Sequence, residues 1–333
     1  MPRHTFRKKI TSDEALEKVN PVNLNLMKKF LKEKSLRSSE KTIGVYESNL
    51  NIFFVWNLEY NDNKLFTDIK KLEFLDFFSY ASDELKLGSA RINNLRSTLS
   101  SFSNFIEKFY DEEYPNFRNV ILKVIDPAPK ESRREKTILS DEQIESLLEY
   151  LTKEKKYQQA CWVALAICSG ARFSELLSFE IDLIDENRTA FGDLFLETTR
   201  QIRTKGRGEQ GKLLYKYILK DKFMPYYNNW LPEREKILKE NNKDTKALFI
   251  KPNGDPATPG VVTGWISEFE SYLKVPFYAH ALRHYLVTLL SKKNIPHPLI
   301  KEIFGWTSIE MVEIYDDSTA KDREYKELEN LKI

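Results

Sequence analysis

The chain has 333 residues, enough for two domains that each bury a core. Its 52 basic and 50 acidic residues leave a net charge of only +2, so charge alone does not indicate a polyanionic partner. The two cysteines, Cys161 and Cys168, are too few for a disulfide scaffold and fit no zinc spacing, and no apolar run is long enough for a transmembrane helix. We therefore expect no signal peptide, no membrane contact and a cytoplasmic location.

Basic residues gather at the start of the chain. Residues 1–20 are expected to form an N-terminal arm, and its first ten residues contain no acid and four bases: Arg3, Arg7, Lys8 and Lys9. A basic arm suits a polyanion, although a solvated terminus can have the same composition.

Residues 21–125 show the apolar periodicity of helices. One stripe has spacings of 3, 4 and 3 residues and consists of Ile43, Tyr46, Leu50 and Phe53. Another has spacings of 4, 3, 4 and 3 and consists of Leu95, Leu99, Phe102, Ile106 and Phe109. Because such spacings place side chains on one helical face, they predict a small all-helical domain whose aromatic residues form the core.

Residues 126–137 are predicted to link this domain to a second one. Pro127 and Pro129 stand beside a run of charged residues, and such a segment cannot continue a packed helix. The second domain is expected over residues 138–333, including a C-terminal tail, and begins with the capping-box pattern from Ser140 to Gln143.

The second domain is expected to combine helices with a small sheet. Two strands are predicted near 192–204 and 212–219, joined by a loop that contains three glycines. Helices are predicted over 141–153, 157–168, from 221 onward, and over 258–273, 279–293, 297–304 and 308–316. The fold class is therefore mainly α with a small β-sheet.

Four residues of the second domain suit attack on a phosphodiester without a metal. Arg172 follows a small-residue turn, His280 and Arg283 share one predicted helical face, and Tyr315 comes 32 residues after Arg283. Arginine can donate two hydrogen bonds to one phosphate and remains protonated. Tyrosine can attack as phenolate and leave again, which makes a covalent intermediate reversible. A cationic side chain at the loop between the two strands can protonate the leaving oxygen as a general acid. The candidates are Lys205, Arg207 and Lys212, of which Lys205 is preferred.

Each of these residues also has an ordinary structural explanation. Arg172 can form a surface ion pair, with Glu175 either orienting it or capping its own helix. Tyr315 and Trp306 can be core aromatics, and His280 can be a hydrogen-bonded histidine without a catalytic role. The order and spacing of the set favour the catalytic interpretation.

These motifs resemble the tyrosine recombinases of the phage integrase family over about residues 22–325. The family's first box, Gly-x-Arg-x-Ser-Glu-Leu, is matched by residues 170–176, and its second, His-x-Leu-Arg-His, by residues 280–284. Phe304-Gly305-Trp306 matches the element that stands nine residues before the nucleophilic tyrosine, with tryptophan replacing the commoner histidine. Lys205 matches the hairpin lysine of the family.

The resemblance implies a two-domain architecture, with a helical core-binding (SAM-like) DNA-binding domain followed by an α+β catalytic domain. It implies a site-specific recombinase, or integrase, that cleaves and rejoins DNA through a 3′-phosphotyrosyl intermediate with no metal and no other cofactor. The catalytic residues that it implies are Arg172, Lys205, His280, Arg283, Trp306 and Tyr315, with Glu175 supporting them.

The resemblance also implies partners. Double-stranded DNA is expected to contact Arg3, Arg7, Lys8, Lys9, Arg91, Arg96, Arg133, Arg134, Lys136 and Arg207. Strand exchange needs four active sites, which implies a homotetramer on two DNA sites, with the tail near 320–333 docked on a neighbouring subunit. Such systems serve phages, transposons and other mobile elements or resolve chromosome dimers, and the sequence leaves the choice open. Some of them also use an accessory directionality factor.

Departures from the family pattern leave two other classes open. Asp316 and Asp317 follow the tyrosine where polar or basic residues are usual, and Tyr285 stands where threonine or serine is common. Two carboxylates there would raise the pKa of the nucleophile and repel phosphate, as in a DNA-binding regulator or phage repressor that has lost cleavage. A type IB topoisomerase shares the chemistry but acts as a monomer. The short arm, with no separate arm-binding domain, favours a simple recombinase.

Overall fold

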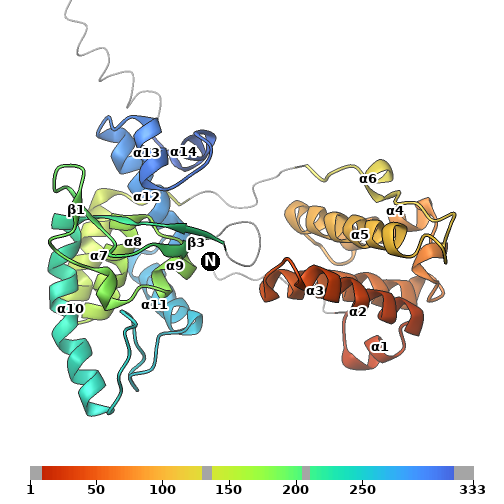
Figure 1. The fold of residues 1–333 in the computed structure, drawn as a ribbon, viewed down its shortest axis with the longest axis horizontal. Helices are drawn as coiled ribbons and strands as arrows, with labels where there is room; N and C mark the ends of the chain where they lie inside the picture. The colour runs from red at the N-terminus through yellow and green to blue at the C-terminus, as the bar shows by residue number, and fades with distance from the viewer. Residues whose placement is uncertain (1–9, 130–136, 205–210, 319–333) are drawn as a thin grey trace, which may run out of the picture. The chain divides into compact units, whose positions relative to one another are not determined.

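The computed structural model describes residues 10–129, 137–204 and 211–318 (Figure 1). These residues form two compact units, which we describe separately. The N-terminal unit comprises residues 10–129, and the C-terminal unit comprises residues 137–204 and 211–318.

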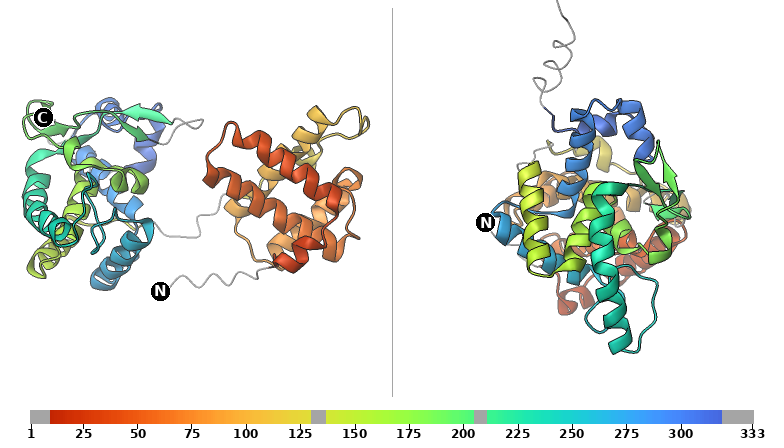
Figure 2. Two further views of the ribbon diagram at one scale, coloured as in Figure 1. Left: turned by 60° about the horizontal axis from the view of Figure 1, so that its bottom comes forward. Right: turned by 90° about the vertical axis from the view of Figure 1, so that its left-hand side faces the viewer.

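The described part of the N-terminal unit is entirely helical, as predicted from its periodicity. Its elements are α1 (Asp13–Glu17), α2 (Pro21–Ser35), α3 (Glu40–Tyr60), the 3-10 helix η1 (Phe66–Asp68), α4 (Lys71–Asp83), α5 (Ser89–Phe109) and α6 (Ile121–Val124). Helices α2 and α3 lie side by side, and α5 packs against both (Figure 2).

Phenylalanine rings fill the core of the N-terminal unit. Phe53 meets Phe77 edge to face with ring centroids 4.9 Å apart, and Phe66 meets Phe102 in the same way at 4.7 Å. Such pairs add about 1 kcal/mol each to the free energy of burial. In the first predicted stripe Leu50 and Phe53 are buried, while Ile43 and Tyr46 are half-buried. The second stripe is buried except for Phe109, the last residue of α5, which is 53% exposed.

The described helices of the C-terminal unit are α7 (Asp141–Lys153), α8 (Tyr157–Ser169), α9 (Phe173–Leu177), η2 (Ile181–Leu183), α10 (Lys220–Glu240), α11 (Pro259–Leu273), α12 (Ala279–Lys292), α13 (His297–Ile303) and α14 (Glu310–Tyr315). Ser140 caps α7 by accepting from the backbone of Gln143 while the Gln143 side chain accepts from the Ser140 backbone, so the predicted capping box is present. The helices predicted in this unit occur within a few residues of their expected bounds.

The strands predicted near 192–204 and 212–219 are each broken into two short ones, and a further strand precedes them. The five strands are β1 (Thr189–Ala190), β2 (Phe195–Glu197), β3 (Ile202–Thr204), β4 (Lys212–Leu214) and β5 (Tyr217–Leu219). The predicted antiparallel pairing across the loop is confirmed by β3 and β4. Antiparallel pairing gives a three-stranded sheet, β1-β2-β5, and a separate hairpin, β3-β4. Thr199 interrupts the first predicted strand because its N–H and hydroxyl donate to the carbonyls of Leu183 and Asp182.

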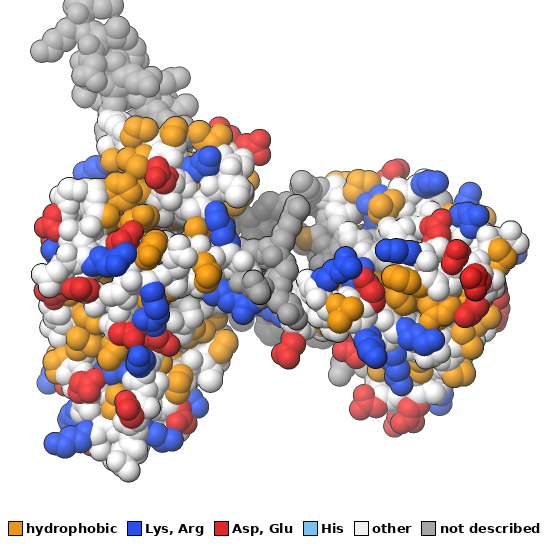
Figure 3. Space-filling model, viewed as in Figure 1, with side chains coloured by type: hydrophobic (Ala, Val, Ile, Leu, Met, Phe, Trp, Pro, Cys, Tyr) orange, Lys and Arg blue, Asp and Glu red, His pale blue; other side chains and the backbone are white. Residues whose placement is uncertain are grey.

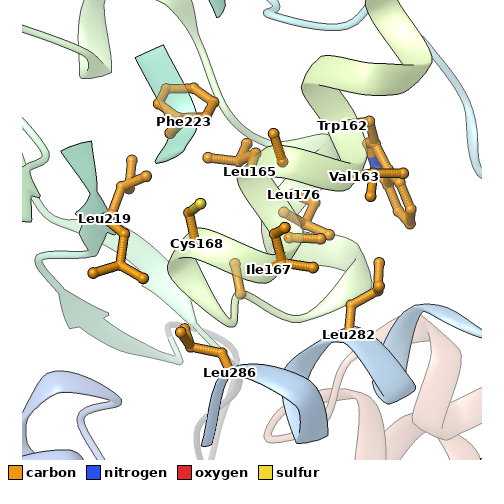
Figure 4. Close-up of a cluster of buried hydrophobic side chains, with 14 of the residues drawn as sticks. Trp162, Val163, Leu165, Ile167, Cys168, Leu176, Leu219, Phe223, Leu282 and Leu286 are labelled. Atoms are coloured by element: carbon orange, nitrogen blue, oxygen red, sulfur yellow. The ribbon is translucent and has the colours of Figure 1, made fainter. Parts of the chain in front are cut away.

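Helix α8 is the centre of the C-terminal unit. Every residue from Ala160 to Ser169 is buried, as expected for a helix that is apolar all round. Leu282 and Leu286 of α12 approach α8 on one side, and Leu219 and Phe223 of β5 and α10 approach it on another (Figure 4). Helix α10 runs beside α8 (Figure 2). This packing fixes both the C-terminal end of α8 and the face of α12, which carry the candidate site.

Acidic and basic side chains are interspersed over the face of each unit seen in Figure 3. This distribution agrees with the near-balanced composition of the whole chain. None of the described helices is long and apolar enough to cross a membrane.

Candidate active site

A glycine turn brings the two boxes of the sequence together. Helix α8 ends at Ser169, and its C-cap residue Gly170 has a φ of +54°, a left-handed conformation that glycine adopts without strain. The Gly170 carbonyl accepts a hydrogen bond from Nη1 of Arg283, a residue 113 positions further along the chain. A Cβ atom at position 170 would lie only 2.3 Å from the ring of Phe304.

Arg172 is the N-cap residue of α9 and is held by Glu175. The Arg172 guanidinium donates to one oxygen of the Glu175 carboxylate (Nη1 to Oε1, 2.8 Å), and the Arg172 backbone N–H donates to the other (2.9 Å). Glu175 thus does both things foreseen for it, because it binds the Arg172 guanidinium and caps its own helix by accepting from the Arg172 backbone N–H. The Arg172 side chain keeps 28% exposure, so it remains accessible to a ligand.

Lys216 is a third member of this network that the sequence did not reveal. Its Nζ lies 2.9 Å from Oε2 of Glu175, and both side chains are almost completely buried. Burial alone would raise the pKa of Glu175, but the charge of Lys216 and the hydrogen bonds from Arg172 and Lys216 outweigh it and lower that pKa to about 2. Glu175 therefore stays ionised near neutral pH. Lys216 stands directly before the apolar strand β5 in the sequence, but its pairing with Glu175 depends on the fold.

Arg283 is buried with unused hydrogen-bond donors. Its guanidinium carbon lies 4.9 Å from the ring centroids of both Phe304 and Trp306. Among the described residues, no acceptor meets Nε or Nη2 of Arg283, nor the indole Nε1 of Trp306. Burial and the nearby charge of Arg172 lower the pKa of Arg283 to about 10, which still leaves it cationic at neutral pH. Because buried donors are normally satisfied, this group has the character of an anion site.

Tyr315, the last residue of α14, directs its hydroxyl to His280. The Tyr315 Oη lies 2.6 Å from Nε2 of His280, which comes from the first turn of α12. Burial, followed by the charges of His284, Arg283 and Arg172, lowers the pKa of His280 to about 4. The imidazole is therefore neutral at pH 7 and can accept the phenolic proton. The Tyr315 ring stacks on Trp306, with centroids 5.0 Å apart.

The two aspartates after Tyr315 lie beside histidines. Oδ2 of Asp317 lies 2.9 Å from Nδ1 of His284, and Oδ2 of Asp316 lies 3.4 Å from Nε2 of His297. The sequence suggested that these carboxylates would face the phosphate and oppose ionisation of Tyr315. In the fold, each of them instead has an imidazole partner.

Tyr285, the alternative nucleophile, lies on α12 and is 8% exposed. Burial and a hydrogen bond with Asp141 raise the pKa of its phenol, which disfavours the phenolate needed for attack. Tyr315 is therefore better placed than Tyr285 to act as a nucleophile.

Several predicted DNA contacts and the hairpin acid lie outside the described residues: Arg3, Arg7, Lys8, Lys9, Arg133, Arg134, Lys136, Lys205 and Arg207. Lys212, the described alternative to Lys205, has its Nζ 3.5 Å from the carbonyl oxygen of Gly305.

Arg91 and Arg96 both lie on α5. Arg91 donates to the Ser48 hydroxyl at 3.3 Å, and Arg96 donates to the carbonyls of Leu122 and Ile125 at the end of α6. Arg96 therefore supports the fold of its own unit.

Comparisons with known proteins agree with this geometry. The phage integrase family matches residues 137–322, more than half of the chain. The SPbeta prophage-derived recombinase-like protein YomM of Bacillus subtilis strain 168 is 28% identical over 222 residues, which span 66% of this chain and 64% of that protein. A tyrosine recombinase of Thermosipho africanus is 24% identical over 291 residues, which span 84% of this chain and 89% of that protein.

Solved structures show the same fold. The XerH site-specific recombinase bound to a palindromic difH substrate has a TM-score of 0.65 at 20% identity, covering 86% of this chain and 79% of its own. The integrase of transposon Tn1549, in complex with transposon right end DNA, has a TM-score of 0.68 at 18% identity, covering 93% and 99%. The fold and the family match define an enzyme class, and the site places a tyrosine hydroxyl beside a histidine and buried arginine donors. The chain belongs to the phage integrase family, the tyrosine recombinases.

Proposed function

We propose that this chain is a site-specific DNA recombinase that cleaves and rejoins DNA through a 3′-phosphotyrosyl intermediate. The observation that carries the proposal is the group of buried donors without acceptors on Arg283 and Trp306, which lies against the ring of the His280-paired Tyr315. A phosphate placed there would satisfy the donors and face the phenol. Arg172 would contribute a second guanidinium, held by Glu175.

In the proposed reaction, the Tyr315 oxygen attacks the scissile phosphorus while its proton passes to Nε2 of His280. The bond from phosphorus to the 5′ oxygen breaks, and Lys205 protonates that oxygen. Arg172, Arg283 and the Trp306 indole stabilise the charge on the pentavalent phosphorus. Rejoining reverses these steps, with a 5′ hydroxyl of another strand as the attacking group. The phosphotyrosine conserves the energy of the phosphodiester, so no energy source from outside is needed.

The proposed partner is double-stranded DNA, in a homotetramer that unites two DNA sites. The similar XerH recombinase and Tn1549 integrase were solved with DNA, which supports the choice of ligand. Strand exchange needs four tyrosines, and the tail from residue 320 onward is proposed to dock on a neighbouring subunit. An accessory directionality factor, use by a mobile element and action in the cytoplasm belong to the same proposal.

A DNA duplex nicked near the scissile position tests the proposal, because release of the short cleaved fragment traps the covalent intermediate. The wild type should form a denaturant-resistant adduct, and Tyr315→Phe should bind the DNA with similar affinity but form none. Tyr285→Phe is the matched control and should still react.

Three other outcomes would change the assignment. Binding of a mapped site by the wild type without any adduct would favour the regulator. An adduct with Tyr315→Phe would show that another residue is the nucleophile. Relaxation of supercoiled DNA by a monomer, with no exchange between two sites, would favour a topoisomerase.

A further inference from the structure

Three residues on one face of α12 contact the nucleophile and the residues just after it. His280, His284 and Thr288 recur at intervals of four residues, so they stand one above the other along the helix. His280 meets the hydroxyl of Tyr315, and His284 meets the Asp317 carboxylate. The Thr288 hydroxyl accepts a hydrogen bond from the backbone N–H of Asp317 at 2.9 Å.

The position of Tyr315 depends on the residues C-terminal to it, because Tyr315 ends its helix. The last helical hydrogen bond of α14 runs from the N–H of Asp316 to the carbonyl of Val312 at 2.7 Å. Asp316 then has extended backbone angles, with φ of −80° and ψ of 109°. Beyond that point the chain is held by hydrogen bonds to His284 and Thr288 of α12 and no longer by those of α14.

The His284 ring connects this anchor to the nucleophile. Its centroid lies 4.6 Å from that of Tyr315, while its Nδ1 bonds to Asp317. The side chains of His284 and Asp317 are 9% and 7% exposed, so their interaction is poorly screened by water. A carboxylate that fixes one ring nitrogen also fixes the orientation of the ring.

We propose that Asp317 is a positioning residue, which acts through His284 to hold the Tyr315 phenol in line with the scissile phosphate. The inference rests on the proposed function. In this role the Asp317 carboxylate supports cleavage, whereas a carboxylate that faced the DNA would only repel it. Asp316 assists from the other side, since its carboxylate lies near His297 and accepts from the backbone N–H of Ser318 at 2.9 Å.

Loss of the anchor should slow attack without weakening DNA binding. A misplacement of about 1 Å can reduce the rate of a positioned reaction roughly 100-fold. We therefore expect Asp317→Ala to reduce the first-order rate of adduct formation by about two orders of magnitude at saturating nicked DNA. The dissociation constant of that DNA should stay close to wild type. Asp244→Ala, a change of an exposed aspartate in the same unit, is the matched control and should leave both quantities unchanged.

A double-mutant cycle separates positioning through His284 from independent effects. His284→Asn should be as slow as Asp317→Ala, and the two changes together should be no slower than the slower single variant. Multiplicative losses in the cycle, or a wild-type rate in Asp317→Ala, would overturn the inference.

Separate control experiments distinguish a loss of folding from a loss of the positioning role. Thermal unfolding identifies variants that have lost their structure, and Asp317→Asn, which keeps the size of the side chain, then replaces Asp317→Ala in the cycle. A wild type that binds a mapped site but never forms an adduct contradicts the proposed function itself. An active wild type with an equally active Asp317→Asn and Asp317→Ala contradicts only the positioning role.

Discussion

Lys216 and Glu175 form an ion pair of 2.9 Å inside the C-terminal unit, where their side chains are only 3% and 2% exposed. Desolvation lowers the pKa of Lys216, and the nearby charge of Glu175 opposes this shift. Glu175 also binds Arg172 through both of its oxygens. A lysine that never reaches the surface therefore helps to set the orientation of an arginine that does.

Lys216→Met should destabilise the protein and slow cleavage. Removing one partner from a buried ion pair costs about 3 kcal/mol of the free energy of unfolding, which urea titration can measure. The pKa of Glu175 should also rise from about 2 toward its ordinary value of 4.5. Ionised Glu175 stabilises the wild type above pH 4.5, and this contribution is lost as the pH falls toward 2. The variant should therefore unfold at a higher pH than the wild type on acidification, and an unchanged acid transition would contradict this role.

Trp306→Phe tests the unused indole donor. The substitution keeps an aromatic ring to stack on Tyr315 but removes the N–H group, which has no acceptor in the described structure. Loss of one such donor to a developing charge costs roughly 100-fold in rate. Single-turnover cleavage of a nicked site measures this loss. Trp306→His restores a donor and should be much faster than Trp306→Phe, whereas equal rates would show that only packing matters.

The imidazole of His280 should titrate near pH 4 in the protein without DNA. Its ordinary pKa is 6.5, and burial with the charges of His284, Arg283 and Arg172 lowers it to about 4. Between these values the unfolded chain binds a proton that the folded chain does not, so this group reduces stability as the pH falls from 6.5 toward 4. Proton NMR of the ring, assigned by its absence in His280→Asn, reports the midpoint. A phosphate bound nearby should raise it, and a midpoint at the ordinary value without DNA would contradict a buried neutral base.

Lys205→Ala should be slow on ordinary DNA because the leaving 5′ oxygen then lacks its acid. Sulfur at the bridging position makes a leaving group that needs no proton, so the variant should recover most of the wild-type rate on that substrate. Lys212→Ala is the matched control and should respond equally to both substrates. Rescue of the Lys212 variant instead would move the acid role to that residue.

Deletion of residues 1–10 should make DNA binding less dependent on salt. Each phosphate contact contributes about −0.9 to the slope of log affinity against log salt concentration, and the deleted segment carries Arg3, Arg7, Lys8 and Lys9. Fluorescence anisotropy at several salt concentrations measures the slope. An unchanged slope would show that the arm does not contact DNA.

The candidate site was largely predictable because its residues belong to short local motifs. The motifs identify Arg172, His280, Arg283 and Tyr315 without knowledge of the fold. The structure adds that the end of α8, the start of α12 and the end of α14 meet, through the Gly170 carbonyl and the His280 hydrogen bond. Helical periodicity likewise predicted the longer helices, which have an apolar face or an apolar circumference. The short helices α1, α6 and α9 were not predicted, and α1 buries none of its residues.

Lys216 and Asp317 could not be assigned in the same way, because their roles depend on contacts between distant segments. The pairing of Glu197 with Tyr217 fixes the register of β2 and β5, and this register places Lys216 beside Glu175. In the sequence Asp317 is only a negative charge near a nucleophile. Its partner His284 lies on α12, a distant segment of the chain. Whether Asp317 supports or opposes catalysis therefore depends on tertiary packing.

The turn at Gly170 has a consequence for genetic studies. Any side chain there would be strained at φ of +54° and would collide with Phe304, whose ring stacks on Trp306 at 4.7 Å. Displacement of Phe304 would carry Trp306 with it, and the carbonyl that holds Arg283 would move as well. In a random mutagenesis screen for lost recombination, Gly170 should therefore recur among the hits as often as the catalytic side chains. A residue without a functional group would then appear essential, because its substitution changes the conformation of the backbone and not a catalytic side chain.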